Sequence, residues 1–164
     1  MGREKGLFNP AKPGGPKGKG RGAGLFFWAK AEMRELDGVS RFLREALARE
    51  GVYQDNPDER YLVELAVVEA CTNVIRHAYR PFPSGRLGLA VKRRGSRLEI
   101  LILDQGVHFD PTRIPPPDLA FPKEGGYGLV VIRKVMTELR YVRRGSRWNC
   151  LLLVREDPKL CSST

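Results

Sequence analysis

Three side chains capable of chemistry recur at four-residue steps in the segment EACTNVIRHAY: Glu69, Asn73 and His77. Because an α-helix turns by about 100° per residue, such positions drift by only about 40° per step and share one face. On that face a carboxylate can accept a proton from an attacking hydroxyl, and an amide oxygen can ligate a hard cation such as Mg²⁺. The same spacing also fits a solvated helix edge, so spacing alone favours neither interpretation.

A second candidate lies where an apolar run ends, because Leu98–Leu103 is followed by Asp104, Gln105 and Gly106. A carboxylate at the end of a central strand can accept a hydrogen bond from an amino group in a pocket. Gly106 permits the backbone to pass close to a flat ligand. Taken alone, this Asp-x-Gly pattern is most often an ordinary turn.

A third candidate is the glycine-rich segment 125–129, GGYGL, which directly precedes an apolar helical pattern. Glycines allow close backbone approach, and the first turn of a helix offers unpaired N–H groups to an anion. A flexible hinge is the alternative interpretation. The usual phosphate-binding pattern GxxxxGK[ST] is absent from the sequence.

The elements that must position these residues include five strands, most of them in hairpins. The first is Leu25–Ala31, and the others pair as Leu87–Lys92 with Leu98–Leu103 and as Thr137–Val142 with Trp148–Val154. The nearly all-apolar run Leu98–Leu103 is expected at the centre of the sheet. Strands that pair in hairpins and do not alternate with helices predict an α+β sandwich, with helices on one face of the sheet.

Three helices are expected to cover that sheet. Asp37 or Ser40 can cap the first, which Gly51 ends, and Asn56 or Asp58 can open the second, which runs to about Tyr79. The predicted buried stripe of the second helix comprises Tyr61, Leu62, Leu65, Val68 and Ile75. The third helix follows the glycine-rich segment and carries on one face Leu129, Ile132, Val135 and Met136.

Taken in order, the three motifs resemble the N, G1 and G2 boxes of the GHKL ATPase superfamily, which includes histidine kinases. The forms EACTNVIRHAY, DQGVHFDP and GGYGLVVI are most similar to its anti-sigma-factor serine/threonine kinase branch. The resemblance covers roughly Leu25–Val154. It implies an α+β two-layer sandwich of the Bergerat type, with a mixed, mostly antiparallel sheet and helices on one face. That domain is expected over residues 25–156, between a flexible tail at 1–24 and a C-terminal tail at 157–164.

For the N box, the resemblance implies roles in catalysis and in metal binding. Glu69 matches the position of the family's general base, and Asn73 matches its Mg²⁺ ligand beside the nucleotide. His77 matches the end of the box, close to the phosphates of ATP. ATP and Mg²⁺ are therefore the cofactors that the resemblance implies.

For the G1 and G2 boxes, the resemblance implies contacts to the nucleotide. Asp104 matches the carboxylate that meets the adenine amino group, and Gly106 lies beside the base. One departure is His108, which stands where the family's G1 box often has a second glycine. The expected lid runs from Pro111 to Glu124 and includes Lys123 as a phosphate contact. The G2 contacts are expected at Gly126, Tyr127, Gly128 and Leu129.

Charge and composition argue against several other classes. The chain has a formal net charge of +10, and half of it lies in residues 1–22. Residues 9–24 hold no large apolar side chain, which predicts a flexible tail because nothing offsets the entropy cost of ordering it. No apolar stretch approaches the ~20 residues of a membrane span, and the 3 cysteines are too widely spaced for a zinc site. A reduced, cytoplasmic protein without membrane contact is expected.

The leading hypothesis is an ATP-binding anti-sigma factor that phosphorylates a serine or threonine on an anti-anti-sigma partner of the STAS type. A sigma factor is then a second expected partner, and the resemblance leaves homodimerisation open. One alternative is a nucleotide-gated switch that binds a partner without catalysis. Another is a nucleic-acid binder that uses the basic tail, which is disfavoured because no aromatic residue between Asn9 and Gly24 is present for base stacking.

Overall fold

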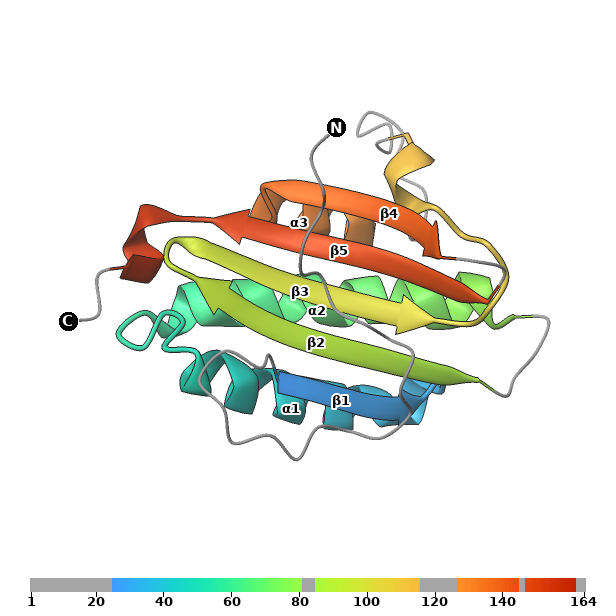
Figure 1. Cartoon of the computed structure of the whole chain (residues 1–164), viewed down its shortest axis with the longest axis horizontal. Helices are drawn as coiled ribbons and strands as arrows, with labels where there is room; N and C mark the ends of the chain where they lie inside the picture. The colour runs from blue at the N-terminus through green and yellow to red at the C-terminus, as the bar shows by residue number, and fades with distance from the viewer. Residues whose placement is uncertain (1–24, 81–84, 116–126, 145–146, 162–164) are drawn as a thin grey trace.

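The chain folds into a sheet covered by a layer of helices (Figure 1). The computed structural model describes residues 25–80, 85–115, 127–144 and 147–161. Its strands are β1 Leu25–Lys30, β2 Arg86–Arg94, β3 Arg97–Asp104, β4 Glu138–Arg144 and β5 Trp148–Glu156, and its α-helices are α1 Leu36–Arg49, α2 Pro57–Ala78 and α3 Tyr127–Val135. Short 3-10 turns are η1 Met33–Glu35, η2 Pro111–Arg113 and η3 Pro158–Cys161. The predicted order of strands and helices is confirmed.

The five strands lie in the order β1-β2-β3-β5-β4, so the apolar strand β3 is central, as predicted. Each neighbouring pair in this order is antiparallel. The described sheet is therefore antiparallel throughout, and the expectation of a mixed sheet is wrong on this point. Hairpins account for β2–β3 and β4–β5, which are successive in the chain, whereas β1–β2 and β3–β5 pair across intervening elements.

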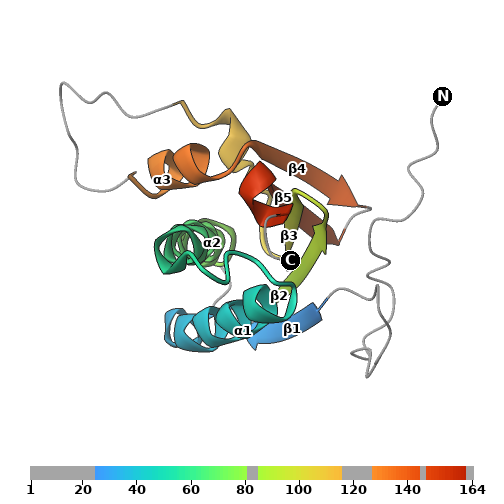
Figure 2. The same cartoon turned by 90° about the vertical axis from the view of Figure 1, so that its left-hand side faces the viewer.

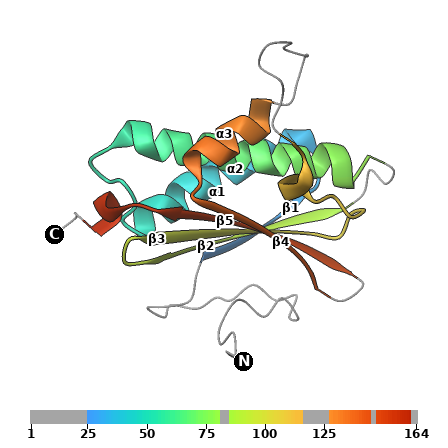
Figure 3. The ribbon, with the colours of Figure 1, turned by 90° about the horizontal axis from the view of Figure 1, so that it is seen from above.

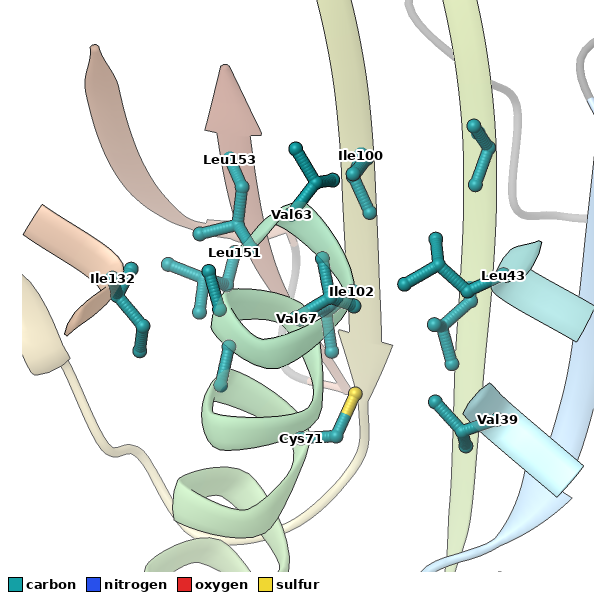
Figure 4. Packing of buried hydrophobic residues seen from close by; sticks show 14 of the residues in the cluster. Val39, Leu43, Val63, Val67, Cys71, Ile100, Ile102, Ile132, Leu151 and Leu153 are labelled. Atoms are coloured by element: carbon teal, nitrogen blue, oxygen red, sulfur yellow. The ribbon is translucent and has the colours of Figure 1, made fainter. Parts of the chain in front are cut away.

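The helices α1, α2 and α3 all lie on the same face of the sheet, as the two side views show (Figures 2 and 3). Between the layers, Val67 and Cys71 of α2 pack close to Ile102 of β3 (Figure 4). The Cys71 side chain is fully buried, and this burial raises the pKa of its thiol, so it behaves as a small apolar residue. The α+β sandwich predicted from the pattern of elements is thus observed.

The start of α1 differs from the prediction, and neither Asp37 nor Ser40 caps it. The turn η1 runs directly into the helix, and Glu35 occupies the N-cap position without a side-chain hydrogen bond. The preceding 3-10 turn supplies a backbone partner, because the N–H of Leu36 bonds to the Met33 carbonyl, so a side-chain cap is not required. At the other end, Gly51 follows the helix with a φ of 65°, which confirms it as the stop.

The start of α2 agrees with one of its two predicted caps. The Asn56 side chain accepts a hydrogen bond from the N–H of Glu59 at 3.2 Å, and Pro57 occupies the first turn. The predicted buried stripe of this helix is only partly correct, because Ile75 is buried whereas Tyr61 and Leu62 are exposed. The residues that α2 buries are Val63, Ala66, Val67, Ala70, Cys71, Thr72, Val74, Ile75 and Ala78. Small side chains on this side let the helix approach the sheet closely.

The packed domain extends past the predicted boundary at residue 156. Leu160, within η3, is fully buried and belongs to the hydrophobic core. A C-terminal tail that begins at residue 157 is therefore wrong, whereas the tail predicted at 1–24 lies outside the described residues. Among the helices that the structure describes, none combines the length and the hydropathy that crossing a bilayer requires.

Candidate nucleotide-binding site

The carboxylate of Glu69 lies against the first turn of α3. A Cβ atom placed on Gly128 would come within 2.3 Å of Oε2 of Glu69, so the absence of a side chain at Gly128 leaves room for the carboxylate. The two helices α2 and α3 are neighbours in the helix layer (Figure 2). Tertiary packing thus brings together the predicted general base and a predicted G2 glycine.

The Asn73 amide borders a narrow pocket between α2, α3 and the sheet. Phe109 and Leu129 are among the other residues that line this pocket. The Nδ2 atom of Asn73 is buried and has no hydrogen-bond partner within the described ranges. A buried donor without a partner costs on the order of 1–3 kcal/mol, so a rearrangement that brings an acceptor to Nδ2 of Asn73 would be favoured.

His77 lies at the end of the same helical face and is exposed. Its ring stacks on the ring of Phe109, with centroids 4.5 Å apart and an interplanar angle of 18°. Phe109 belongs to the loop that follows β3. The stacked pair therefore connects the last predicted residue of the N box to the G1 segment.

Asp104 occupies the end of β3 and is almost fully buried. Its Oδ1 atom accepts two hydrogen bonds, from the Asn149 side chain at 2.8 Å and from the N–H of Gly106 at 2.9 Å. Burial raises the pKa of Asp104 above the ordinary carboxyl value, although these two hydrogen bonds oppose the shift. Because both bonds go to Oδ1, the Oδ2 atom is the oxygen left to meet an amino group.

The G1 turn is docked on the C-terminal end of α2. The N–H of Val107 donates to the Ala78 carbonyl at 2.8 Å, which satisfies one of the carbonyls that a helix end leaves unpaired. The Tyr79 hydroxyl accepts from the N–H of Gln105 at 2.8 Å and donates to the Arg86 carbonyl at 2.7 Å. Helix α2 therefore positions both the N box and the turn after Asp104.

The close contact at Gly106 leads to a prediction about stability. A Cβ atom on Gly106 would lie 2.4 Å from the Ala78 carbonyl oxygen, and a backbone atom cannot move aside cheaply. Gly106→Ala should therefore lower the free energy of unfolding by about 1–3 kcal/mol, as overpacking does. Urea denaturation measures this difference.

The matched control is Gly38→Ala in α1, where the added Cβ would lie at an ordinary 3.6 Å from the Phe27 ring. Alanine is the better helix former, so this variant should be more stable by roughly 0.5–1 kcal/mol. If Gly106→Ala unfolds at the wild-type urea concentration, the tight docking of the G1 turn on α2 is contradicted.

The structure brings most of the predicted site residues to the C-terminal half of α2, but not all of them can be placed. Gly126 and Lys123 lie outside the described residues, as does the lid from residue 116 onward. Tyr127 is 45% exposed at the start of α3, and Leu129 is buried in the core. His108 is exposed, and its ring lies 5.1 Å from that of Tyr141.

Three residues of the site were not among the predicted contacts: Tyr79, Phe109 and Asn149. The aromatic pair with His77 and the bridge through the Tyr79 hydroxyl join segments that are distant in the chain. Asn149 reaches Asp104 because β5 lies beside β3, with these two residues in register. A polar residue at the start of an apolar strand was the one sequence signal for Asn149.

The side chains present fit a magnesium nucleotide. The Nδ2 atom of Asn73 is a donor for an anionic group, and the buried Asp104 carboxylate is an acceptor for an amino group. The absence of a side chain at Gly128 leaves room for the Glu69 carboxylate beside the first turn of α3. Over the described part of the chain, no three His, Cys, Asp or Glu side chains gather as a metal cluster. A cation at Asn73 would therefore take most of its ligands from phosphate and water, as Mg²⁺ commonly does.

The fold and the site define a class of protein. The family model described as the histidine kinase-like ATPase domain matches residues 27–155, which is most of the chain. The chain belongs to this family. Its box residues are those on which the resemblance in sequence was based, and its α+β architecture is the one that the resemblance implied.

Particular relatives are protein kinases by name. The chain is 36% identical over 114 residues to the serine-protein kinase RsbW of Halalkalibacterium halodurans, a match that covers 64% of this chain and 67% of the relative. It is 33% identical over 98 residues to the serine/threonine-protein kinase BtrW of Bordetella bronchiseptica, covering 57% and 68%. With RsbW of Bacillus cereus the identity is 33% over 86 residues, covering 48% and 53%.

Among solved structures, the histidine kinase domain of a blue-light activated histidine kinase from Erythrobacter litoralis is similar at a TM-score of 0.45. The sequence identity is 20%, and the match covers 76% of this chain and 64% of the other.

Proposed function

We propose that this protein is an ATP-dependent serine/threonine protein kinase that acts on a small regulatory protein. The observation that carries the proposal is the contact between the Glu69 carboxylate and Gly128, at the start of a helix whose N–H groups suit phosphate. Relatives named as serine-protein kinases support the same reaction. The resemblance to anti-sigma kinases supports an anti-anti-sigma protein of the STAS type as substrate and a sigma factor as a second partner.

In this proposal, each box of the site has a separate task. Asp104 and Asn149 hold the adenine end, with Asp104 Oδ2 accepting from the exocyclic amino group. The absence of a side chain at Gly128 leaves room for the Glu69 carboxylate at the start of α3, whose N–H groups would bind the phosphate chain. The oxygen of the incoming serine hydroxyl bonds to the γ-phosphorus, and the Glu69 carboxylate accepts the proton of that hydroxyl. The bond from phosphorus to the β,γ-bridging oxygen breaks, which yields phosphoserine and ADP, and Glu69 later releases the proton to water.

The expected role of Mg²⁺ is limited to the phosphates of the nucleotide. Asn73 is the residue that would hold Mg²⁺, and a bound Mg²⁺ supplies charge neutralisation of the phosphates. The side chains themselves orient the nucleotide and move the proton. Orientation of the two reacting oxygens is expected to contribute a large share of the rate.

The proposal is tested with the purified chain, γ-labelled ATP and a panel of STAS-domain anti-anti-sigma proteins. We expect label on a serine or threonine of at least one of them, and calorimetry should give a saturable heat with ADP. Nucleotide binding without transfer to any panel member would favour a nucleotide-gated switch. A chain that binds no adenine nucleotide would overturn the proposal entirely.

Gly128→Ala provides a further prediction about the same contact. The nearest atom to the added Cβ is Oε2 of Glu69, the end of a flexible side chain, so the carboxylate should move while the helices remain packed. We expect the transfer rate to fall at least about 10-fold, because displacing a general base by an ångström is costly. Unfolding temperature and single-turnover rate, measured on the same preparation, separate the two effects. An unchanged rate would show that Glu69 does not act from its observed position.

A further inference from the structure

Arg133 links α3 to the segment that leaves the G1 box. Its Nη2 atom donates to the Ile114 carbonyl and lies 3.5 Å from the Pro111 carbonyl oxygen. Both carbonyls belong to η2 or to the residue that follows it. Within the described ranges Arg133 forms no ion pair with a carboxylate, and the partners of its guanidinium are backbone carbonyls.

The turn that Arg133 holds is capped by Asp110, whose carboxylate accepts from the N–H and the hydroxyl of Thr112 at 2.9 and 2.6 Å. The backbone bonds inside the turn are weaker than this cap. The N–H of Ile114 reaches the Pro111 carbonyl at 3.4 Å, and the N–H of Arg113 reaches the Asp110 carbonyl at 3.4 Å. Both are long for a hydrogen bond. The last carbonyls of a helical turn lack partners within the turn, and a cationic side chain is a favourable donor for them. Arg133 is therefore well suited to fix the end of η2.

The helix that carries Arg133 is itself fixed. Its buried residues Leu129, Ile132 and Val135 pack in the core, and its first turn is in contact with Glu69 of α2. At its C-terminal end, Nη1 of Arg155 donates to the Val135 carbonyl at 3.0 Å. Helices α2 and α3 thus form a stable frame against which Arg133 holds the loop.

Two residues of the held loop pack close to the N-box residues Asn73 and His77. Phe109 and Pro111 line the same pocket as Asn73, and Phe109 stacks on His77. Any shift of η2 away from α3 would move these two side chains relative to Asn73. The spacing between the G1 segment and α3 is therefore coupled to the shape of the pocket.

We propose that Arg133 is a positioning residue for nucleotide binding, which orders the loop after the G1 box through its bond to the Ile114 carbonyl. This inference rests on the proposed function, since it concerns the same pocket. Ordering a loop before the ligand arrives raises affinity because less entropy is lost on binding. Arg133 acts on the nucleotide through the loop and not through its own charge.

The first test needs no nucleotide. Arg133→Met keeps the aliphatic stem and removes the donors, whereas Lys134→Met removes an exposed charge from the next position on α3. In the full chain, hydrogen–deuterium exchange should become faster for a peptide spanning residues 107–115 in Arg133→Met only. Exchange in β3 should be unchanged in both variants. Equal exchange of the 107–115 peptide in wild type and Arg133→Met would overturn the proposed tie.

The second test measures the affinity for ADP and for ATP, each with Mg²⁺, by calorimetry. Arg133→Met should weaken both by about the same factor, roughly tenfold for the loss of the bond to the Ile114 carbonyl, and Lys134→Met should weaken neither. Arg133→Lys, which keeps the charge but fewer donors, should restore only part of the affinity. A larger loss for ATP than for ADP, or full rescue by lysine, would indicate direct contact with phosphate and overturn the positioning role.

The two proposals fail in different ways. If wild type binds both nucleotides and Arg133→Met binds them equally well, the inference about Arg133 is wrong and the proposed function stands. If wild type binds neither nucleotide, both are wrong. If Arg133→Met is unstable in thermal melts, the nucleotide affinities of Arg133→Lys and wild type are compared instead. Equal affinities of these two proteins would overturn the inference about Arg133.

Discussion

Glu69→Gln should lower the rate of phosphoryl transfer from ATP to a protein hydroxyl by about 10²- to 10⁴-fold, the range typical of a lost general base. Glutamine has the same size and still fits beside Gly128, but its amide cannot accept the hydroxyl proton. The affinity for ADP should change little, because this step concerns the incoming hydroxyl. Single-turnover transfer to a STAS partner and calorimetry with ADP measure the two quantities.

The matched control for Glu69 is Glu64→Gln on the same helix. Glu64 accepts hydrogen bonds from Ser40 and Arg44 of α1, and its role is to connect the two helices. Its substitution should leave the transfer rate within about twofold of wild type, since a partly exposed ion pair contributes little. Equal rates for Glu69→Gln and wild type would show that another group accepts the proton.

Asp104→Asn should weaken the binding of adenine nucleotides by about 10- to 100-fold while leaving the fold intact. Asparagine keeps an Oδ1 atom, so the hydrogen bonds from Asn149 and Gly106 survive. Only Oδ2 is changed, from an acceptor to an NH₂ donor that would oppose the adenine amino group. Loss of a hydrogen bond to a charged group is worth about 1.5–3 kcal/mol, which corresponds to this range. Calorimetry with ADP measures it.

The same variant has a distinct effect on stability. Burial raises the pKa of Asp104 in the folded protein, so the ionised carboxylate opposes folding at pH values above that raised pKa. The cost is relieved as the pH falls through the folded value toward the ordinary carboxyl range. Without nucleotide, Asp104→Asn should therefore be at least as stable as wild type at pH 7, and this advantage should shrink in acid. Urea denaturation of both proteins at pH 7 and at an acidic pH measures this difference in the free energy of unfolding.

The exposed carboxylate of Asp55 offers a control, because it precedes α2 at the end far from the G1 turn. Asp55→Asn should change neither the ADP affinity nor the pH dependence of stability. If Asp104→Asn binds ADP as tightly as wild type, the assignment of Asp104 to the adenine amino group is wrong.

Local patterns were sufficient for much of the fold. Strand-like runs on either side of the Gly-Ser pairs at 95–96 and 145–146 predicted the two hairpins, because pairing in a hairpin depends on residues a few positions apart. The stops were also local, since Gly51 with its positive φ ends α1 and the Asn56 side chain caps α2. For the same reason the place of Asp104 at the end of the central strand was predictable.

The sequence pattern did not predict which side of a helix is buried when both sides carry apolar residues. Helix α2 has apolar residues on opposite sides, with Tyr61 and Leu65 on one and Val63 and Val67 on the other. Periodicity cannot choose between them, because both sides repeat at helical spacing. Packing against the sheet chose the side with the smaller residues, and Tyr61 remained 61% exposed. The start of α1 failed differently, since a 3-10 turn replaced the expected side-chain cap.

The sequence by itself determined the chemical types and their order: a carboxylate one helical turn from an amide, a carboxylate at a strand end, and glycines before a helix. These depend on neighbouring residues, so single-chain spacing is enough to define them. Only the tertiary structure decided which of them meet. It placed Gly128 against Glu69, Asn149 on Asp104, and Arg133 on the loop after the G1 box. Such contacts join distant segments, and they arise from how the helices and strands pack, which no local period encodes.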